Sequence, residues 1–261
     1  MQGVQGKIIV ITGASAGIGA TTAKQAGAAG AKLILAARRK KELDEVAAES
    51  GSGHLVVPTD VTVRAQVEAL AKAALDTHGR VDVWINNAGR GISKPTSQLD
   101  DDDLDTMFRD NVKSALYGMQ AILPHFKERN DGQIINLSSL LGRIPYVPVR
   151  SAYAAAKHAL NALTATLRLE LRGSYPGIRL TTISPGPVAT DFGTTALHGG
   201  ADSKTFPGAQ SADEVAEHIL RAIVERPIDV YTRAVYADQV RTYYNDIDAV
   251  ERASPFAQPK P

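Results

Sequence analysis

The chain has 261 residues and carries 29 lysines and arginines against 28 aspartates and glutamates, a formal net charge of +1. This length suits one large α/β domain. The nearly balanced charge gives no general attraction to nucleic acid or anionic lipid. The absence of cysteine excludes disulfides, a thiolate nucleophile and cysteine metal sites. No apolar run approaches the roughly 20 residues that span a bilayer, and residues 1–6 lack a signal-peptide pattern, so we expect a cytoplasmic protein without membrane contact.

The first element is a short β-branched run at 7–11, which ends in a glycine-rich turn and is followed by a helical stretch at 20–29. Glycines would let the turn bend sharply and lie close to a pyrophosphate, whose charge would rest on the amides of the helix N-terminus. The alternative is a glycine-rich turn that binds nothing. The coenzyme-binding residues predicted here are Gly13, Ser15, Gly17, Ile18 and Gly19.

The second predicted strand, at 32–37, ends where an acidic residue would bind the adenosine ribose hydroxyls of NAD. Ala37 takes that place here, and Arg38 and Arg39 follow it. Without the carboxylate nothing repels a 2′-phosphate, and a guanidinium can pair with that phosphate through two charge-assisted hydrogen bonds. The sequence therefore favours NADP(H) over NAD(H), unless the basic run at 38–41 is only the solvated start of a helix.

A third strand at 54–58 leads into Asp60 and Val61, which we predict beside the adenine, although an aspartate here also suits a turn. A helix at 63–78 and a fourth strand at 81–85 follow. This strand ends in two consecutive asparagines and a glycine, which are suited to fixing the central sheet, and Asn87 is predicted to line the adenine-ribose side of the crevice.

The next helix starts with four aspartates at 100–103 and continues to 126. Carboxylates favour the positive end of a helix, and successive helical positions point in different directions. We therefore interpret the run as a solvated helix start and predict no metal site. Asn111, a polar residue among apolar neighbours in this helix, is either a satisfied core amide or a functional one.

The fifth strand, at 133–137, is followed by two serines, and the helix after it, at 150–172, carries Tyr153 and Lys157. A four-residue offset places the phenol and the ammonium on the same helical face, one turn apart. A neighbouring cation favours the phenolate, so we expect Lys157 to lower the pKa of Tyr153 and make it a proton donor and acceptor. The motif Y-x-x-x-K is common, however, and on its own identifies no function.

The remaining elements are a strand, a helix, a last strand and a polar, proline-containing tail, at 178–183, 211–225, 229–232 and about 235–261. Alternating strands and helices predict a Rossmann-like, doubly wound sheet of about seven parallel strands with helices on both faces, in a single domain over 1–261. The segment at 191–210, rich in glycine and threonine, is a predicted lid over the substrate. Its His198 is expected to be a pocket or surface residue and not a catalyst.

Taken in order, these motifs resemble those of the short-chain dehydrogenase/reductase family, in its compact single-domain branch. The resemblance runs from residue 7 to about 234 and is carried by T-G-x-x-x-G-x-G at 12–19, D-V at 60–61, N-N-A-G at 86–89, N-V at 111–112, Ser139, Y-x-x-x-K at 153–157 and P-G at 185–186.

The resemblance implies an NADP(H)-dependent carbonyl reductase or alcohol dehydrogenase. Tyr153 would protonate the substrate oxygen, or act as the base in the oxidative direction, and Lys157 would hold the nicotinamide ribose. Ser139, which fits the family's S-x-x-G, would donate a hydrogen bond to the carbonyl oxygen, and Asn111 would hold a water of a proton relay. Contacts with the nicotinamide carboxamide are implied for Pro185, Gly186, Val188 and Thr190.

Ser139 and Tyr153 are one residue further apart than is usual in the family, so we expect the loop at 143–149 to be altered. Apolar residues predict a pocket for steroid-like, aromatic or acyl-chain ketones, formed by Ile92, Ile144, Tyr146, Val147, Phe192 and Leu197. The resemblance also implies a homodimer or homotetramer, packed through the helices at 101–126 and 150–172.

Two alternatives accompany this interpretation. The first is a catalytically silent NADP(H)-binding sensor or interaction protein on the same fold. The second is an isomerase-type enzyme of the extended branch, which would need a different glycine spacing and a longer substrate domain.

Overall fold

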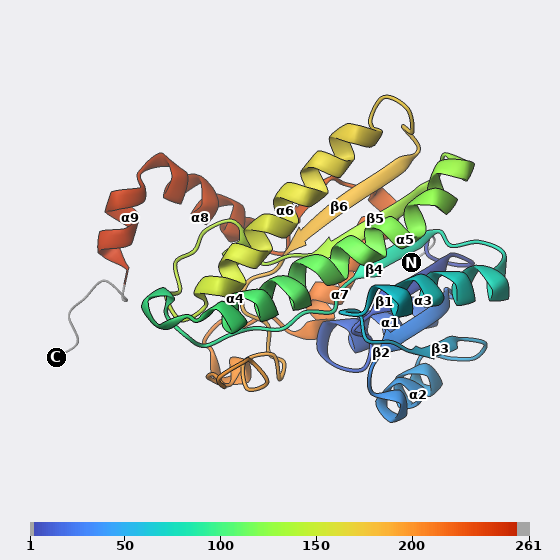
Figure 1. The fold of residues 1–261 in the computed structure, drawn as a ribbon, viewed down its shortest axis with the longest axis horizontal. Coiled ribbons are helices and arrows are strands. Elements are labelled where there is room, and N and C mark those ends of the chain that lie inside the picture. Colours follow the sequence, from blue (N-terminus) through green and yellow to red (C-terminus); the bar gives the residue numbers. More distant parts are fainter. Residues whose placement is uncertain (1–2, 255–261) are drawn as a thin grey trace.

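A computed structural model describes residues 3–254 of the chain. A single sheet of seven parallel strands lies at its centre, in the order β3-β2-β1-β4-β5-β6-β7 (Figure 1). The predicted doubly wound parallel sheet is therefore confirmed. Its strands are β1 (Ile8–Thr12), β2 (Lys32–Ala37), β3 (Leu55–Pro58), β4 (Val83–Asn86), β5 (Gly132–Leu137), β6 (Ile178–Ser184) and β7 (Asp229–Tyr231).

Helices cover both faces of this sheet (Figure 1). Ile9 and Ile11 belong to the core shared with one set of helices, and Ile8 and Val10 belong to the other core, as the two-residue period of a strand requires. The first set is α1 (Gly17–Ala28), α2 (Lys40–Glu49) and α7 (Ala212–Glu225). The second set is α3 (Arg64–His78), α5 (Ser114–Arg129) and α6 (Ser151–Leu171).

The strand order reverses between β1 and β4, which lie side by side at the middle of the sheet. In parallel sheets, ligands bind outside the carboxyl ends of the strands at such a reversal. The sequence places a motif after each central strand at this edge: the glycine turn after β1, N-N-A-G after β4, the two serines after β5 and Pro185-Gly186 after β6. The topology therefore brings the predicted site residues together.

The helix expected at 101–126 contains a π turn. It consists of α4 (Asp101–Phe108), the π segment Arg109–Lys113 and α5, so Asn111 lies in the widened turn. Such turns add one residue to a helical repeat and are frequent at functional sites. The apolar period alone cannot reveal a single extra residue.

The segment predicted as a polar tail contains two helices, α8 (Ala234–Asn245) and α9 (Ile247–Ala253), which extend away from the sheet (Figure 1). Tyr236 and Tyr243 are buried against Leu140 and Ile144, so these helices cover the loop that follows β5. Residues 255–261 of that predicted tail lie outside the described part of the chain. Among residues 3–254, no helix is long and apolar enough to cross a membrane.

Candidate active site

The glycine turn after β1 is held by the end of β4. Gly13 and Gly17 have φ angles of 66° and 53°, in the left-handed region that glycine adopts without strain. The Thr12 hydroxyl accepts hydrogen bonds from the backbone N–H groups of Asn87 (3.1 Å) and Ala88 (3.2 Å), and Asn87 Nδ2 donates to the Thr12 carbonyl at 2.9 Å. The Asn87 side chain, predicted as a coenzyme contact, therefore also fixes the turn.

The N-terminus of α1 is open. Ala16 precedes the helix, no side chain caps its first turn, and that turn carries no acidic residue. A Cβ placed on Gly17 would lie 3.3 Å from the Thr190 side chain, so the segment after β6 lies against this turn. Uncapped amides at the positive end of a helix fit a pyrophosphate, and the predicted residues Ser15, Ile18 and Gly19 lie in the same turn.

Arg39, which lies between β2 and α2, reaches the glycine turn. Its Nη2 donates to the Ser15 hydroxyl at 3.0 Å, and its Nη1 pairs with Glu42 at 3.2 Å. Arg38 is exposed beside it. Two cations therefore flank the position where the adenosine ribose of a dinucleotide would lie, and the strand itself ends in Ala37.

Asp60, predicted to lie near the adenine, occupies a turn. One of its carboxylate oxygens accepts from the Thr62 N–H at 2.9 Å and from the Thr62 hydroxyl at 2.7 Å. Burial raises the pKa of Asp60, but these hydrogen bonds and the charge of Arg38 outweigh that effect and hold the pKa below its ordinary value. Asp60 is therefore a turn residue, as the alternative interpretation of the sequence held. Val61 follows it at the same edge of the sheet.

Tyr153 and Lys157 lie deep in the molecule, 7% and 4% exposed, on adjacent turns of α6. The Lys157 ammonium is 5.6 Å from the centre of the Tyr153 ring and donates to the Leu137 carbonyl at 2.8 Å. Ser139 follows β5 and interacts with the phenol through its hydroxyl. The structure thus gathers the three residues that the sequence places in two separate segments.

Burial dominates the protonation of this pair. It raises the pKa of Tyr153 to about 12, against the opposing effects of the Ser139 hydrogen bond and the Arg150 charge, and it lowers the pKa of Lys157 to about 8. The Tyr153 shift is opposite in direction to the one expected from the Y-x-x-x-K spacing, because removing water from a phenolate disfavours its charge. At neutral pH Tyr153 is consequently protonated, as a proton donor must be.

Asn111 connects the π turn to the N-N-A-G segment. Its Oδ1 accepts from the Arg90 N–H at 3.2 Å, and its Nδ2 donates to the Arg90 carbonyl at 2.9 Å. A Cβ on Gly89 would lie 2.7 Å from Asn111 Oδ1 and 3.5 Å from Lys157 Nζ. Asn111 is therefore a satisfied amide that also lies beside the Lys157 ammonium.

A buried chain of polar side chains supports this edge of the sheet. The sequence indicated a role in fixing the sheet for the asparagines at the end of β4, but not the partners of Asn86. Trp84 Nε1 donates to Asn86 Oδ1, Asn86 Nδ2 donates to Asn136 Oδ1, and Asn136 Nδ2 donates to the Thr164 hydroxyl, each at 2.8 Å. Because each buried group has a partner, the chain fixes β4 and β5 against α6 without an unmet polar group in these links. The sequence signal that could have revealed this polar chain is Asn136, a polar residue inside a buried strand.

The segments after β6 lie against other parts of the site. The Pro185 carbonyl accepts from the Leu140 N–H at 2.8 Å, and Val188 pairs with Gln210. A Cβ on Gly186 would overlap the Tyr236 hydroxyl of α8. Pro185, Gly186 and Val188 therefore face the strands' carboxyl edge between the serine loop and the C-terminal helices.

Asp103 departs from the expected solvated run of aspartates. Asp100 caps α4 and shares a capping box with Asp103, which confirms the predicted helix start, but Asp103 is only 3% exposed. Lys94 Nζ pairs with one of its oxygens at 2.5 Å, and His198 Nε2 lies 2.5 Å from the other. His198 thus anchors the segment at 191–210 to α4. Within residues 3–254 no cluster of three or more histidines and carboxylates could hold a metal ion.

We expect Asp103→Asn to reduce the acid sensitivity of folding. Lys94 and His198 hold the Asp103 pKa well below its ordinary value of 3.8. As pH falls, the Asp103 carboxylate therefore takes up a proton in the unfolded chain before it does so in the folded protein. The stabilisation that ionised Asp103 gives the fold is thus fully present above about pH 4 and is lost at lower pH. Urea unfolding at pH 7 and pH 3 should show a smaller loss of stability in Asp103→Asn than in the wild type. Asp101→Asn, an exposed position of the same turn, is the control, and equal pH dependence in all three proteins would contradict the assignment.

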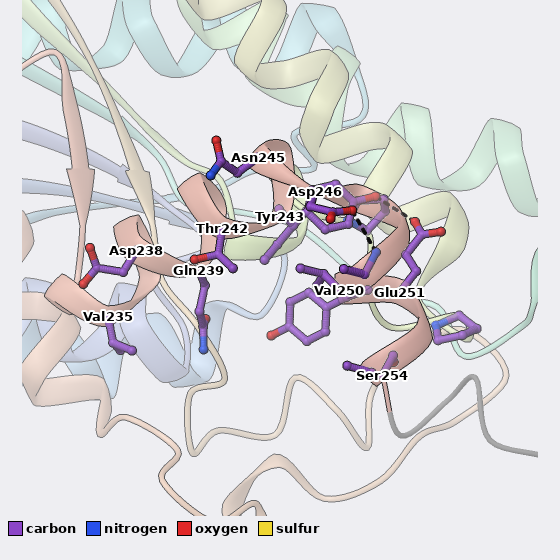
Figure 2. A pocket seen from close by; sticks show the side chains of 16 residues that line it. Val235, Asp238, Gln239, Thr242, Tyr243, Asn245, Asp246, Val250, Glu251 and Ser254 are labelled. Atoms are coloured by element: carbon purple, nitrogen blue, oxygen red, sulfur yellow. Dashed lines mark hydrogen bonds between the residues drawn. The ribbon is translucent and has the colours of Figure 1, made fainter.

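The expected apolar pocket is divided in two. Ile92, Phe192 and Leu197 pack around Tyr153, with the Phe192 ring centre 5.4 Å from that of Tyr153. Ile144 and Tyr146 instead line a cavity of about 920 Å³ against α8 and α9, together with Val235, Tyr243 and Val250 (Figure 2). This second cavity includes no predicted catalytic residue, and it escaped the sequence analysis because its far wall is formed by the segment expected as a tail.

Comparison with known proteins gives one consistent result. The family model described as short chain dehydrogenase matches residues 7–199. An uncharacterized oxidoreductase of Staphylococcus epidermidis is 37% identical over 199 residues, which cover 74% of this chain and 85% of that protein.

Two solved structures are similar over nearly their whole length. A short chain dehydrogenase/reductase from Burkholderia phymatum in complex with NAD has a TM-score of 0.83 and 28% identity, covering 96% of this chain and 97% of its own. A short chain dehydrogenase from Burkholderia cenocepacia in complex with NADP has a TM-score of 0.82 and 26% identity, covering 99% and 100%.

Proposed function

The chain belongs to the short chain dehydrogenase family of oxidoreductases, and we propose that it is an NADP(H)-dependent carbonyl reductase, which in the reverse direction acts as an alcohol dehydrogenase. The observation that carries the proposal is the buried cluster of Ser139, Tyr153 and Lys157 at the carboxyl edge of the sheet. A protonated phenol next to a hydroxyl and an ammonium has the composition needed to polarise a carbonyl and protonate its oxygen.

The residues around the glycine turn fit a dinucleotide. The open N-terminus of α1 would receive the pyrophosphate, and the guanidiniums of Arg38 and Arg39 would receive the 2′-phosphate of NADP(H). When bound, the nicotinamide coenzyme supplies or accepts the hydride. Lys157 would hold the nicotinamide ribose, because its ammonium lies at the carboxyl end of β5 next to Leu137.

During reduction, we assign the proton transfer to the Tyr153 hydroxyl, which is protonated at neutral pH. The Ser139 hydroxyl would donate a second hydrogen bond to the same substrate oxygen. Asn111, beside Lys157 and Gly89, would order a water that returns the proton to the site. In oxidation the steps would run in reverse: the Tyr153 phenol would first give up its proton through the water held by Asn111, and the phenolate would then accept the proton of the alcohol.

The test is the initial rate of NADPH oxidation by the purified protein with a panel of ketones and aldehydes. The proposal expects carbonyl-dependent oxidation of NADPH and formation of the matching alcohol. Coenzyme binding, followed by nicotinamide fluorescence, without turnover of any panel member would instead favour a catalytically silent coenzyme-binding protein.

Coenzyme preference gives a separate prediction. We expect Arg39→Gln to lower kcat/KM for NADPH relative to NADH by about 10- to 100-fold, because a charge-assisted hydrogen bond contributes about 1.5–3 kcal/mol. Arg38→Asp is expected to act in the same direction. Lys41→Gln, which removes an exposed cation of α2 paired with Glu45, is the matched control and should leave the ratio unchanged. If neither arginine variant alters the ratio, these side chains do not read the 2′-phosphate.

A further inference from the structure

Arg150 lies near enough to Tyr153 for its charge to act on the phenol, and it has no role in the proposed mechanism. It is the residue immediately before α6, three positions ahead of Tyr153 and therefore about one helical turn away on the same side. Its positive charge acts on the Tyr153 hydroxyl, and the phenol in turn acts on the guanidinium. A cation therefore stands beside the group that would face the substrate oxygen.

The Arg150 guanidinium is half-buried without a counter-charge. Its Nη1 donates to the Ile92 carbonyl at 3.1 Å, and across residues 3–254 no carboxylate pairs with it. Other partly buried arginines of the chain do have carboxylate partners: Arg143 with Asp229 at 2.6 Å and Arg233 with Glu214 at 2.7 Å. A guanidinium has five N–H donors, so most of those on Arg150 remain open to a ligand. Holding such a charge away from water is costly unless an anion joins it.

The fold leaves room for this side chain next to the catalytic cluster. A Cβ on Gly91 would lie 2.8 Å from Arg150 Nη1 and 2.9 Å from the Phe192 ring, and a Cβ on Gly200 would lie 3.1 Å from Nη2. The Phe192 ring packs edge-on against Tyr153. The guanidinium, the Phe192 ring and the phenol thus border one region, bounded by the loop after β4 and by the segment at 191–210.

We propose that Arg150 binds a carboxylate of the substrate, so that the carbonyl compound reduced at Tyr153 is an oxo acid and the product a hydroxy acid. The proposal rests on the proposed reductase function and narrows its substrate class. A guanidinium fork matches a carboxylate through two parallel hydrogen bonds. Since one helical turn separates Arg150 from Tyr153, the carboxylate and the carbonyl should be only a few bonds apart. The rest of the molecule would pack against the half-buried Phe192 ring.

The test compares acids with their own methyl esters, which keep the carbonyl and lose the charge. The pairs are 3-oxobutanoate with methyl 3-oxobutanoate, and phenylglyoxylate with methyl phenylglyoxylate. We expect the wild type to favour at least one acid over its ester, and Arg150→Met to lower kcat/KM for that acid by about 10- to 100-fold, mainly through KM, while the ester changes little. Arg150→Lys, which keeps the charge but not the fork, should retain an intermediate preference.

Arg143→Met is the matched control, because this arginine is also partly buried but already has a carboxylate partner. It should change acid and ester in the same proportion. An acid-to-ester ratio unaffected by Arg150→Met, or equal losses on both substrates together with a lower Tm, would overturn the proposal and leave Arg150 as a support for the Ile92 loop. Turnover of neutral ketones without any acid preference overturns this inference alone. Failure to turn over any carbonyl compound overturns the proposed function as well.

Discussion

Replacement of Tyr153 by phenylalanine is expected to lower kcat for carbonyl reduction by about 100- to 10,000-fold, the usual contribution of a positioned general acid. Phenylalanine keeps the ring that packs against Phe192 and removes only the hydroxyl. Because the phenol is 7% exposed, bulk water has little access to replace the missing donor. NADPH binding, measured by nicotinamide fluorescence, should change little.

Tyr175→Phe is the control for this prediction, since Tyr175 packs at the distant end of the α3, α5 and α6 core and touches none of the site residues. It should retain wild-type kcat. If Tyr153→Phe reduced carbonyl compounds at a rate near that of the wild type, another group would have to supply the proton, and the assignment of Tyr153 would be wrong.

Gly19→Ala should weaken NADPH binding by at least about 100-fold, which corresponds to about 2.7 kcal/mol. A Cβ at this position would overlap the Gly13 carbonyl oxygen and lie 2.5 Å from Asn87 Nδ2. The glycine turn would have to separate from the end of β4, and the amides of α1 would move with it. Overpacking of this kind also lowers stability by about 1–3 kcal/mol. Isothermal titration with NADPH and urea unfolding measure the two effects.

Gly173→Ala provides the comparison, because a Cβ there meets nothing within 4 Å. We expect its coenzyme affinity and its unfolding midpoint to match the wild type. Unchanged NADPH affinity in Gly19→Ala would show that the turn after β1 is not the pyrophosphate site.

Much of the fold follows from local sequence pattern. Short β-branched runs such as 7–11 alternate with longer helical stretches, and this alternation predicts a parallel sheet because each crossover must carry a helix. The motifs of the site are also visible, since each follows a strand and parallel strands bring their carboxyl ends to one edge. What the pattern supplies is the order of the elements and the residues at their ends.

The features that escaped prediction depend on partners distant in sequence. The α8 and α9 segment is polar. Its main buried residues, Tyr236 and Tyr243, form an apolar cluster with Leu140 and Ile144, which lie about 100 residues earlier in the chain. In the sequence Asp103 does not differ from its exposed neighbours. Its burial depends on Lys94 and His198, which belong to two other segments. The spacing of Tyr153 and Lys157 reveals their shared face but not their burial, which reverses the expected direction of the Tyr153 pKa shift. Arg150 is likewise distinguished by having no carboxylate partner among residues 3–254, which its sequence neighbours do not reveal.

The most direct test of the proposed reaction is to follow the hydride itself. The wild-type protein would be incubated with NADPH carrying deuterium at the transferable position of the nicotinamide, together with a panel of ketones and aldehydes, with and without a carboxylate. Mass spectrometry of the products should find one deuterium on the carbinol carbon of the alcohol formed. NADPH that binds but gives no labelled alcohol from any member of the panel would contradict hydride transfer to a carbonyl as the function of this protein.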